Sequence, residues 1–535
     1  MRVFSFLKNE YIWVILITVL VLIVSFFPTI HNLFITPSDK VYTMAYNYYP
    51  DYFQFVSWMR DGGNGDLALS SRFTPEVFPR KFGHTFFSIY GFVISIVSKN
   101  FFLGFVLGRI IFGFLRLLMI YFLISLLIKK KKERIVCFMA VIFLPSFYNV
   151  VNMNGFFEIR YFLPGITNFD VFRRLTFLPH HMMATILMIL GLAAYSRGLK
   201  TNLYKYSLIS AVLMFIASLV NPATILSMGV TLMSAGLILV MSLSKDAKRE
   251  LIGHTAVSFL GIIAAIIYFK FYLFTVFPWD LFYKNDVTKM QWPFVDYLGA
   301  LGWALPLGII GIILARQYYK NILFVVVACW GLGSVLGVLI STHFSIISMF
   351  RLFQAQQAIP LGILSGIGIV EIFRRSSNRA VPYFFIIIIV LTSIPYYWVS
   401  FAEQMSEGRV DNFYLYVSKS TYGAYEFLDR QTPFESVVLA GYYSGQMLPA
   451  FSHNRVLVGH ADGTYNYENK LDIMTRFYSN KYSRAELDRV VKENNISYFY
   501  FGPDTPRPEN TSLSDYPSAR LIYQNGDNYI YKATN

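Results

Sequence analysis

Asp51 is the side chain whose type and surroundings best suit catalysis. It lies in segment 48–53, YYPDYF, about twenty residues after a long apolar run ends, and Trp58 and Arg60 follow it. A carboxylate among aromatic rings can act as a general base, and ring faces can pack against a sugar. Arg60 is a candidate for binding the substrate. The structural alternative is that Asp51 caps a helix beginning directly after it, a common role for Asp.

Residues 152–179 contain a second group of charged side chains between two apolar runs. Glu158 and Asp170 offer carboxylate oxygens that could bind a divalent cation or position an acceptor. Guanidinium groups suit a phosphate because they offer paired hydrogen bonds and a permanent charge. The candidates for that role are Arg160, Arg173 and Arg174. Arginines at a membrane boundary also contact lipid headgroups, so that alternative stays open.

His180 and His181 begin the next apolar run. Neighbouring residues of a helix point in different directions, so at most one of the two can face a given site. We take His180 as the substrate-binding candidate, and the alternative is a solvated histidine at the membrane interface.

Two glycine-containing segments, 441–445 and 459–464, follow short apolar runs near the C-terminus. Neither matches a dinucleotide-binding or phosphate-loop pattern, so we interpret them as loop glycines. His460 and Asp462 lie in the second segment and could face the same site as Asp51, although the sequence does not establish this.

Composition places most of the chain in lipid. Of 535 residues, 55% are hydrophobic and 14% are charged, against about 25% charged in a typical soluble protein. The net charge of +15 comes from basic runs between apolar segments, such as Lys129 to Lys132, which argues against nucleic-acid binding. Cys137 and Cys329 lie inside apolar runs, where they are expected to pack as small hydrophobic side chains.

A transmembrane helix needs about 20 mostly apolar residues. The sequence predicts eleven such crossings, near residues 11–30, 101–128, 135–151, 180–196, 206–221, 223–242, 252–273, 297–315, 322–341, 352–373 and 381–400. No small-x-small cleavage pattern follows the first run, which indicates a retained signal anchor.

The apolar stretch 85–97 is too short for a crossing and predicts a helix lying flat on the membrane surface. With that assignment, the basic runs all fall on the cytoplasmic side, as the positive-inside rule prefers. The N-terminus is then cytoplasmic, and loops 31–84 and 152–179 and the tail 401–535 lie outside the cytoplasm. We expect a multi-pass protein of the plasma membrane.

The tail 401–535 predicts a small soluble α/β domain with a largely parallel sheet. Strand-length apolar runs occur at 436–440, 455–459 and 497–501, with helical patterns between them. Residues 520–524 and 528–532 flank an Asn-Gly turn and predict a terminal hairpin. The fold class expected for the whole chain is therefore a polytopic α-helical membrane domain, residues 1–400, with a C-terminal α/β domain.

This layout resembles the GT-C superfamily of polyprenyl-phosphate-sugar-dependent glycosyltransferases. The chain begins with one apolar run, followed by a long outer loop that contains Asp51 among aromatic residues. A short interfacial helix comes next, and then a long span that ends in a basic turn. The stretch 84–98, with Arg109 and Arg116 after it, is similar to the protein O-mannosyltransferase and aminoarabinose-transferase branch. The sequence does not fit the oligosaccharyltransferase branch, because no Trp-Trp-Asp occurs in the tail.

The resemblance implies a lipid-phosphate-linked sugar donor, transfer on the outer membrane face and inversion at the anomeric carbon. Asp51 is the residue that it identifies as catalytic. Arg351 lies at the start of the tenth predicted span. Its guanidinium group could neutralise the departing polyprenyl phosphate. The alternative is that the long side chain reaches along the helix and places the guanidinium at the membrane interface.

The expected partners are the polyprenyl-phosphate sugar, membrane lipids and a lipid, glycan or protein acceptor, without nucleic acid. A divalent cation is the one cofactor considered. Three alternatives remain: a transporter or lipid-carrier flippase, a surface-polysaccharide polymerase or ligase, and a non-catalytic relative whose tail binds a partner. The sequence shows one clear helix break, at Pro222, rather than the matched breaks of two transporter halves.

Overall fold

The computed structural model describes residues 10–46, 48–153, 155–162, 177–242, 245–288, 293–344, 358–378, 380–514 and 516–534. Contacts between Cα atoms divide the chain into two compact units. The helical unit comprises Met1–Phe27, Leu107–Phe269 and Asp286–Ser406, and the mixed unit comprises Pro28–Val106, Lys270–Asn285 and Glu407–Asn535. The tail thus belongs to the same unit as the first loop and the segment that precedes residue 286.

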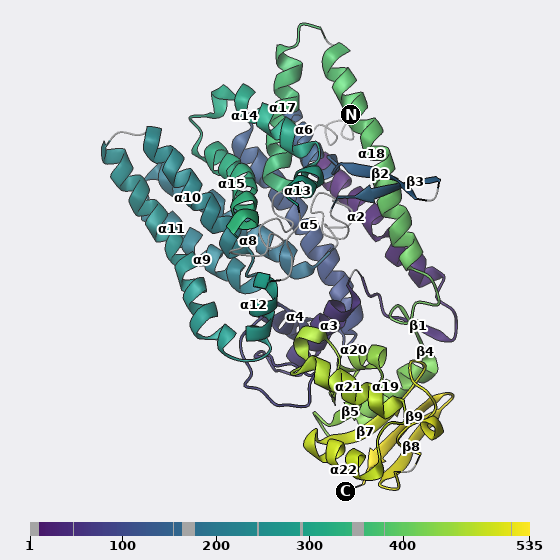
Figure 1. Ribbon diagram of the computed structural model, residues 1–535. Coiled ribbons are helices and arrows are strands. Elements are labelled where there is room, and N and C mark those ends of the chain that lie inside the picture. Colours follow the sequence, from purple (N-terminus) through teal and green to yellow (C-terminus); the bar gives the residue numbers. More distant parts are fainter. Residues whose placement is uncertain are drawn as a thin grey trace. The chain divides into compact units, whose positions relative to one another are not determined.

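The helical unit is built mainly from long apolar helices and one hairpin (Figure 1). The helices that lie wholly or mostly in it are α2 (Glu10–Phe34), α5 (Phe101–Leu127), α6 (Lys131–Phe143), α8 (Pro179–Thr201), α9 (Tyr204–Val220), α10 (Thr224–Ser242), α11 (Lys245–Phe271), α13 (Phe294–Leu301), α14 (Ala304–Leu314), α15 (Ile322–Phe344), α17 (Ala358–Arg375) and α18 (Ala380–Glu407). The hairpin pairs β2 (Tyr148–Met153) with β3 (Phe156–Tyr161). The hydrophobic core of the helical unit lies where α6, α13, α14, α15 and α17 meet.

Among the described residues, seven helices are long and apolar enough to cross a membrane, and an eighth crossing results if the bent pair α13 and α14 is one span. Large apolar side chains on these helices are exposed, including Leu20 at 61%, Leu237 at 66% and Trp398 at 73%. Such surfaces are unfavourable in water and match the hydrocarbon of a bilayer.

The predicted count of eleven crossings is not confirmed. Seven of the predicted runs are the helices α2, α5, α8, α10, α11, α15 and α18, and run 297–315 is the pair α13 and α14, bent by 72°. Helix α9 has only 17 residues. The prediction of a single crossing over residues 135–151 is wrong. Helix α6 ends at Phe143, before Pro145, and strand β2 begins at Tyr148.

The mixed unit contains shorter helices and the larger sheet. Its helices are α3 (Tyr49–Gly63), α4 (Thr85–Ser95), most of α12 (Trp279–Thr288), α19 (Lys419–Gln431), α20 (Tyr442–Phe451), α21 (Tyr467–Tyr478) and α22 (Arg484–Glu493). Its strands are β1 (Lys40–Tyr42), β4 (Tyr416–Ser418), β5 (Val437–Leu439), β6 (Arg455–Val456), β7 (Ile496–Phe501), β8 (Ala519–Asn525) and β9 (Asn528–Ala533). Helix α4 has 11 residues and is too short to span a bilayer core of roughly 30 Å.

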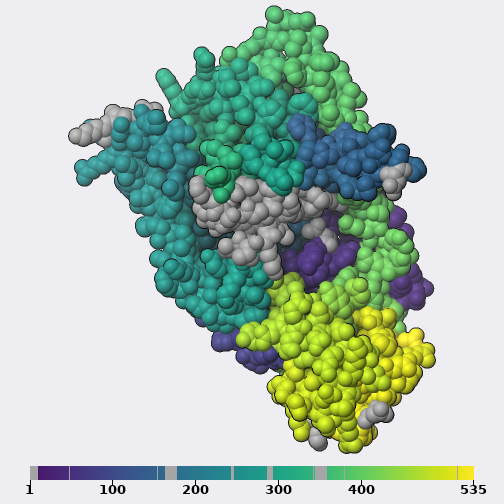
Figure 2. All heavy atoms as spheres, viewed as in Figure 1, coloured from purple at the N-terminus to yellow at the C-terminus, as the bar shows by residue number. Residues whose placement is uncertain are grey.

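The tail folds around a five-stranded sheet in the order β6-β5-β7-β9-β8, and its residues form one continuous mass, yellow-green to yellow in Figure 2. Strands β6, β5 and β7 are parallel, as predicted, whereas β9 and β8 are antiparallel additions, so the sheet is mixed. The predicted terminal hairpin is confirmed, with Gly526 at φ 57° in its turn. Helix α22 begins with a capping box between Ser483 and Glu486.

Buried arginines connect the first loop to the tail within the mixed unit. Arg72 forms an ion pair with Asp61 at 2.8 Å and donates to the carbonyl oxygen of Ser452 at 2.7 Å. Arg455 donates to the carbonyl oxygen of Ser71 at 2.9 Å and pairs with Glu435. Strand β1 also pairs with β4. Residues 40–81 are therefore fixed against residues 416–456.

Candidate active site

Asp51 lies in the first turn of α3, a helix that the chain enters from extended backbone at Tyr48. Pro50 suits this position because the first residues of a helix have no backbone acceptor for their N–H groups. Tyr48 is the N-cap residue and makes no side-chain cap. The capping alternative for Asp51 is therefore wrong, and the carboxylate is available for another contact.

The position of α3 is fixed by close backbone packing on its neighbour α4. A Cβ atom added to Gly62 would lie 1.9 Å from the carbonyl oxygen of Ser88, and one added to Gly91 would lie 2.0 Å from that of Met59. Only glycine permits so close an approach at these two points. Helix α20 packs on α3 as well (Figure 1), so Asp51 is presented by a well-supported helix.

His460 is the partner of Asp51. Its Nε2 lies 2.8 Å from Asp51 Oδ1, a hydrogen bond in which the imidazole N–H donates to the carboxylate. Among the described residues, His460 is the only hydrogen-bond partner of Asp51. The two residues are 409 positions apart in the chain, and the mixed unit contains both.

The exposure of the two side chains assigns their roles. Asp51 is 44% exposed, whereas His460 is 5% exposed, and the Nδ1 atom of His460 is buried without a hydrogen-bond partner among the described residues. An acceptor can therefore reach the carboxylate but not the second nitrogen of the ring. Within this pair, Asp51 is the group that can take a proton from a substrate, and His460 can act only through it.

Further polar groups surround this pair. Asn285 of α12 donates through its side-chain amide to Asp462, two residues after His460. Partial burial raises the pKa of the Tyr48 hydroxyl, and the charges of Asp51, Tyr442 and Asp462 raise it further. Tyr48 and Tyr442 are 60% and 39% exposed. An exposed tyrosine ring and a second carboxylate therefore lie, with Asp51, close enough to Tyr48 to interact with it electrostatically, and such a surface suits a polyhydroxylated ligand.

The second glycine-containing segment is structural, as the sequence indicates, and it is also the segment that presents His460. A Cβ atom on Gly459 would lie 2.6 Å from the carbonyl oxygen of Gly445, which belongs to the first glycine segment. His460 and Asp462 were predicted from the sequence as residues that could face the site. Nothing in the sequence indicated Asn285 or Tyr442, because their placement depends on how distant segments pack.

Arg60 lies near the other end of α3 from Asp51 and forms an ion pair with Asp429 of α19. Partial desolvation raises the pKa of Asp429, but the hydrogen bond from His453 and the charge of Arg60 outweigh it and hold that pKa at about 2. The structure therefore places Arg60 in a contact with the tail and does not bring it to Asp51.

The remaining candidates are in the helical unit or outside the described residues. Glu158 and Arg160 form an ion pair with each other at 3.0 Å on strand β3, and both side chains are half exposed. His180 and His181 are 3% and 7% exposed with their rings 4.4 Å apart, so the expectation of a solvated interfacial histidine is wrong. Four candidates lie outside the described residues: Asp170, Arg173, Arg174 and Arg351.

No group of three or more metal-ligating side chains occurs in the part of the chain that the structure describes. Asp51 and His460 supply two donors that bond to each other, which does not fit a site built to hold a divalent cation. The chemistry that these two residues support directly is acid–base chemistry.

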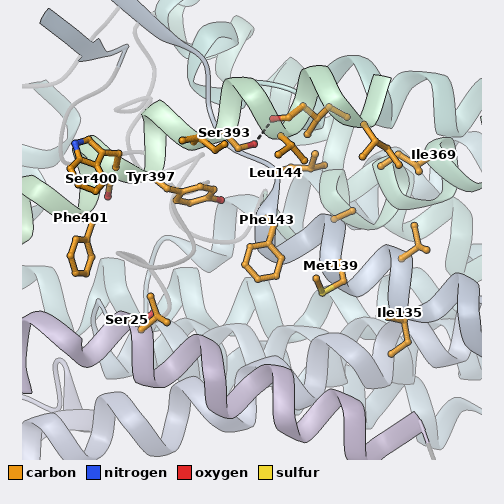
Figure 3. Close-up of a pocket in the computed structure, with 18 of the residues that line it drawn as sticks. Ser25, Ile135, Met139, Phe143, Leu144, Ile369, Ser393, Tyr397, Ser400 and Phe401 are labelled. Atoms are coloured by element: carbon orange, nitrogen blue, oxygen red, sulfur yellow. Dashed lines mark hydrogen bonds between the residues drawn. The ribbon is translucent and has the colours of Figure 1, made fainter. Parts of the chain in front are cut away.

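The helical unit has a separate cavity of about 750 Å³ between α2, α6, α17 and α18 (Figure 3). Its lining is almost entirely apolar, with Phe143, Leu144 and Phe401 among the side chains that Figure 3 labels. The polar groups in the lining are Ser25, Ser393, Tyr397, Ser400 and Gln404. Such a lining suits a hydrocarbon chain, and the described residues in it include no carboxylate, histidine or cation that could take part in catalysis.

No protein-family model matches the chain, and no curated protein sequence matches it either. Its fold is nevertheless similar to solved structures. The oligosaccharyltransferase of Archaeoglobus fulgidus in the apo form superposes with a TM-score of 0.55 at 12% identity, covering 99% of this chain and 75% of that one. The same archaeal enzyme, AglB, in complex with an inhibitory peptide and a dolichol-phosphate, gives 0.52 at 12% identity over 98% and 74%.

ArnT from Cupriavidus metallidurans, bound to undecaprenyl phosphate, gives a TM-score of 0.50 at 12% identity, covering 97% of this chain and 98% of that one. The fold of this chain is thus similar both to an archaeal oligosaccharyltransferase and to ArnT. The described residues contain seven helices long and apolar enough to cross a membrane, as in a multi-pass membrane protein.

Proposed function

We propose that this protein is a membrane glycosyltransferase that transfers a sugar from a polyprenyl-phosphate carrier to an acceptor hydroxyl on the outer face of the membrane. The proposal rests on the Asp51 carboxylate in the first turn of α3, which is half exposed and has one oxygen in a hydrogen bond with His460. The similarity of the fold to those of the archaeal oligosaccharyltransferase and ArnT also supports it. A lipid-phosphate donor is supported by the dolichol-phosphate and undecaprenyl phosphate bound to AglB and ArnT.

In the proposed reaction, the acceptor oxygen attacks the anomeric carbon while Asp51 takes the hydroxyl proton. The bond between that carbon and the phosphate oxygen breaks, and its electron pair leaves with the polyprenyl phosphate. A single displacement of this kind inverts the anomeric centre, as in inverting glycosidases, where a carboxylate base acts on the face opposite the leaving group. Arg351, Arg173 and Arg174 remain candidates for binding the phosphate.

The test is transfer from labelled polyprenyl-phosphate sugars by membranes that contain the wild type or Asp51→Asn. We expect the variant to lose at least about 10²-fold in rate, the usual contribution of a general base, while expressing normally. Asp39→Asn is the matched control, because Asp39 is an exposed carboxylate in the same loop, and it should transfer at the wild-type rate. Unimpaired transfer by Asp51→Asn would remove Asp51 from the mechanism. Uptake of a soluble solute into vesicles without sugar transfer would favour a transporter.

A further inference from the structure

We infer that His460 is a positioning residue for Asp51, so that the C-terminal tail completes the active site instead of forming a separate binding module. The inference rests on the proposed function and adds a role for the tail within it. It is based on the burial of the imidazole, on its contacts and on the rigidity of the turn that presents it.

The imidazole is held in one orientation. Its ring lies 6.1 Å from the ring of Phe73 in an edge arrangement and 6.2 Å from the ring of Phe282, centroid to centroid. With the side chain 5% exposed and Nδ1 lacking a partner among the described residues, the bond to Asp51 is the one polar contact that the ring makes. A buried nitrogen without a partner costs free energy, so a purely structural role would be filled better by an apolar side chain.

The backbone around His460 is fixed by the first loop. Thr464 Oγ1 accepts from the N–H of Gly459 at 3.1 Å and lies 2.7 Å from the carbonyl oxygen of Phe73. Ser71 donates to the carbonyl oxygen of Gly463. The turn is therefore closed by the bond between Gly459 and Thr464 and anchored at its second end to residues 71–73, on the loop that also contains Asp51, and the position of His460 relative to α3 has little freedom.

A half-exposed carboxylate on the first turn of a helix can adopt several side-chain rotamers. The bond from His460 Nε2 occupies Oδ1 and thereby selects one of them, leaving Oδ2 to meet the acceptor hydroxyl. Loss of that bond should misplace the base without removing any group that binds the donor or the acceptor. The expected consequence is a lower kcat with little change in KM, since misplacement by about 1 Å can cost about 10²-fold in rate.

Two substitutions separate the hydrogen bond from the bulk of the ring. His460→Gln places an amide N–H near the original Nε2, whereas His460→Asn places it near Nδ1, too far to reach Asp51. In membranes with labelled polyprenyl-phosphate sugar, we expect His460→Asn to lose about 10²-fold in kcat with KM for donor and acceptor unchanged. His460→Gln should recover most of that loss. Equal losses in the two variants, or a rise in KM without a fall in kcat, would overturn the inference.

His460→Leu provides a second variant that fills the buried site without a donor, so that the comparison survives if His460→Asn does not fold. It should show the same fall in kcat with an unchanged unfolding temperature. His460→Asn placed in an Asp51→Asn background should add no further loss, because the contact is already gone. If Asp51→Asn is inactive and His460→Asn is fully active, the inference alone fails. If Asp51→Asn transfers at the wild-type rate, Asp51 has no part in the mechanism and the role of His460 fails with it, whereas a wild type that transfers no sugar would overturn the proposed function.

Discussion

Arg72 and Asp61 form an ion pair at 2.8 Å in which the arginine side chain is 2% exposed and the aspartate 12%. Burial raises the pKa of Asp61 against the opposing effect of Arg72, and burial lowers the pKa of Arg72 against the effect of Asp61. Both directions indicate that desolvation outweighs the attraction within the pair. The pair therefore holds the first loop in place although both charged groups lose their hydration. Removing one of the two side chains should lower the stability of the fold strongly.

We expect Arg72→Met to destabilise the protein by about 3–5 kcal/mol, because it leaves Asp61 buried without its partner. The measurement is thermal unfolding in detergent. The double variant Arg72→Met with Asp61→Leu should regain most of the loss, since no unpaired charge remains. Arg507→Met, which removes one side of an exposed pair with Asp527, should change stability by less than about 1 kcal/mol. Equal effects of Arg72→Met and Arg507→Met would contradict the assignment.

The contacts of Asp429 with His453 and Arg60 predict a pH dependence of stability. The pKa of Asp429 is about 2 in the folded protein and about 3.9 in an unfolded chain, so the ionised carboxylate stabilises the fold. That contribution is fully present above about pH 4 and is lost as the pH falls towards 2. Asp429→Asn should therefore lower stability by about 1–2 kcal/mol at pH 6, and the difference from wild type should shrink between pH 4 and 3. A difference that grows on acidification would refute the prediction.

Gly459 tests the packing that presents His460. Gly459→Ala would place a Cβ atom 2.6 Å from both the carbonyl oxygen of Gly445 and the Cδ1 atom of Phe73. We expect the turn to shift and sugar transfer to fall by about tenfold or more, since small misplacements of catalytic groups are costly. Gly229→Ala is the control, because open space surrounds that position. Its activity should be unchanged, and its helix should gain up to about 1 kcal/mol.

Membrane orientation is tested by reporter fusions. A reporter that is active only outside the cytoplasm should be active when fused after residue 410, next to the tail. The same reporter fused after residue 200, in the predicted cytoplasmic basic run, should be inactive. The reverse pattern, or activity at both sites, would show that the parity of the crossings is wrong and that the first loop does not face the outer compartment.

The sequence predicted the parts of the fold that depend on local pattern. Hydrophobic length identified the long helices such as α2 and α18, and alternation with an Asn-Gly turn identified the β8–β9 hairpin. It failed where local composition is ambiguous. Run 135–151 is apolar enough for a span, but Pro145 stops the helix and the remaining residues form strand β2.

The candidate site shows the same division. Asp51 could be selected from its neighbours in the chain, and His460 could be named as a possible residue in a glycine-containing turn. Their contact could not be predicted, because it depends on the pairing of β1 with β4 and on the seating of Arg72 and Arg455. His180 was the substrate-binding candidate with a solvated interfacial histidine as the alternative, and that alternative is wrong because the side chain is buried; the packing of helices around it is not encoded in the residues next to it.

The pairing of β1 with β4 also constrains the order in which the protein can form. Lys40 pairs with Ser418, so strand β1 must wait, after leaving the ribosome, until the chain has grown by several hundred residues. Contacts of such high sequence separation form late and slowly. During that interval the first loop is exposed without its partner, and unpaired strands are prone to misassembly. A chain that stops before Tyr416 would insert its helices yet never close this ladder, so truncation should be detected as a defect in maturation rather than in membrane insertion.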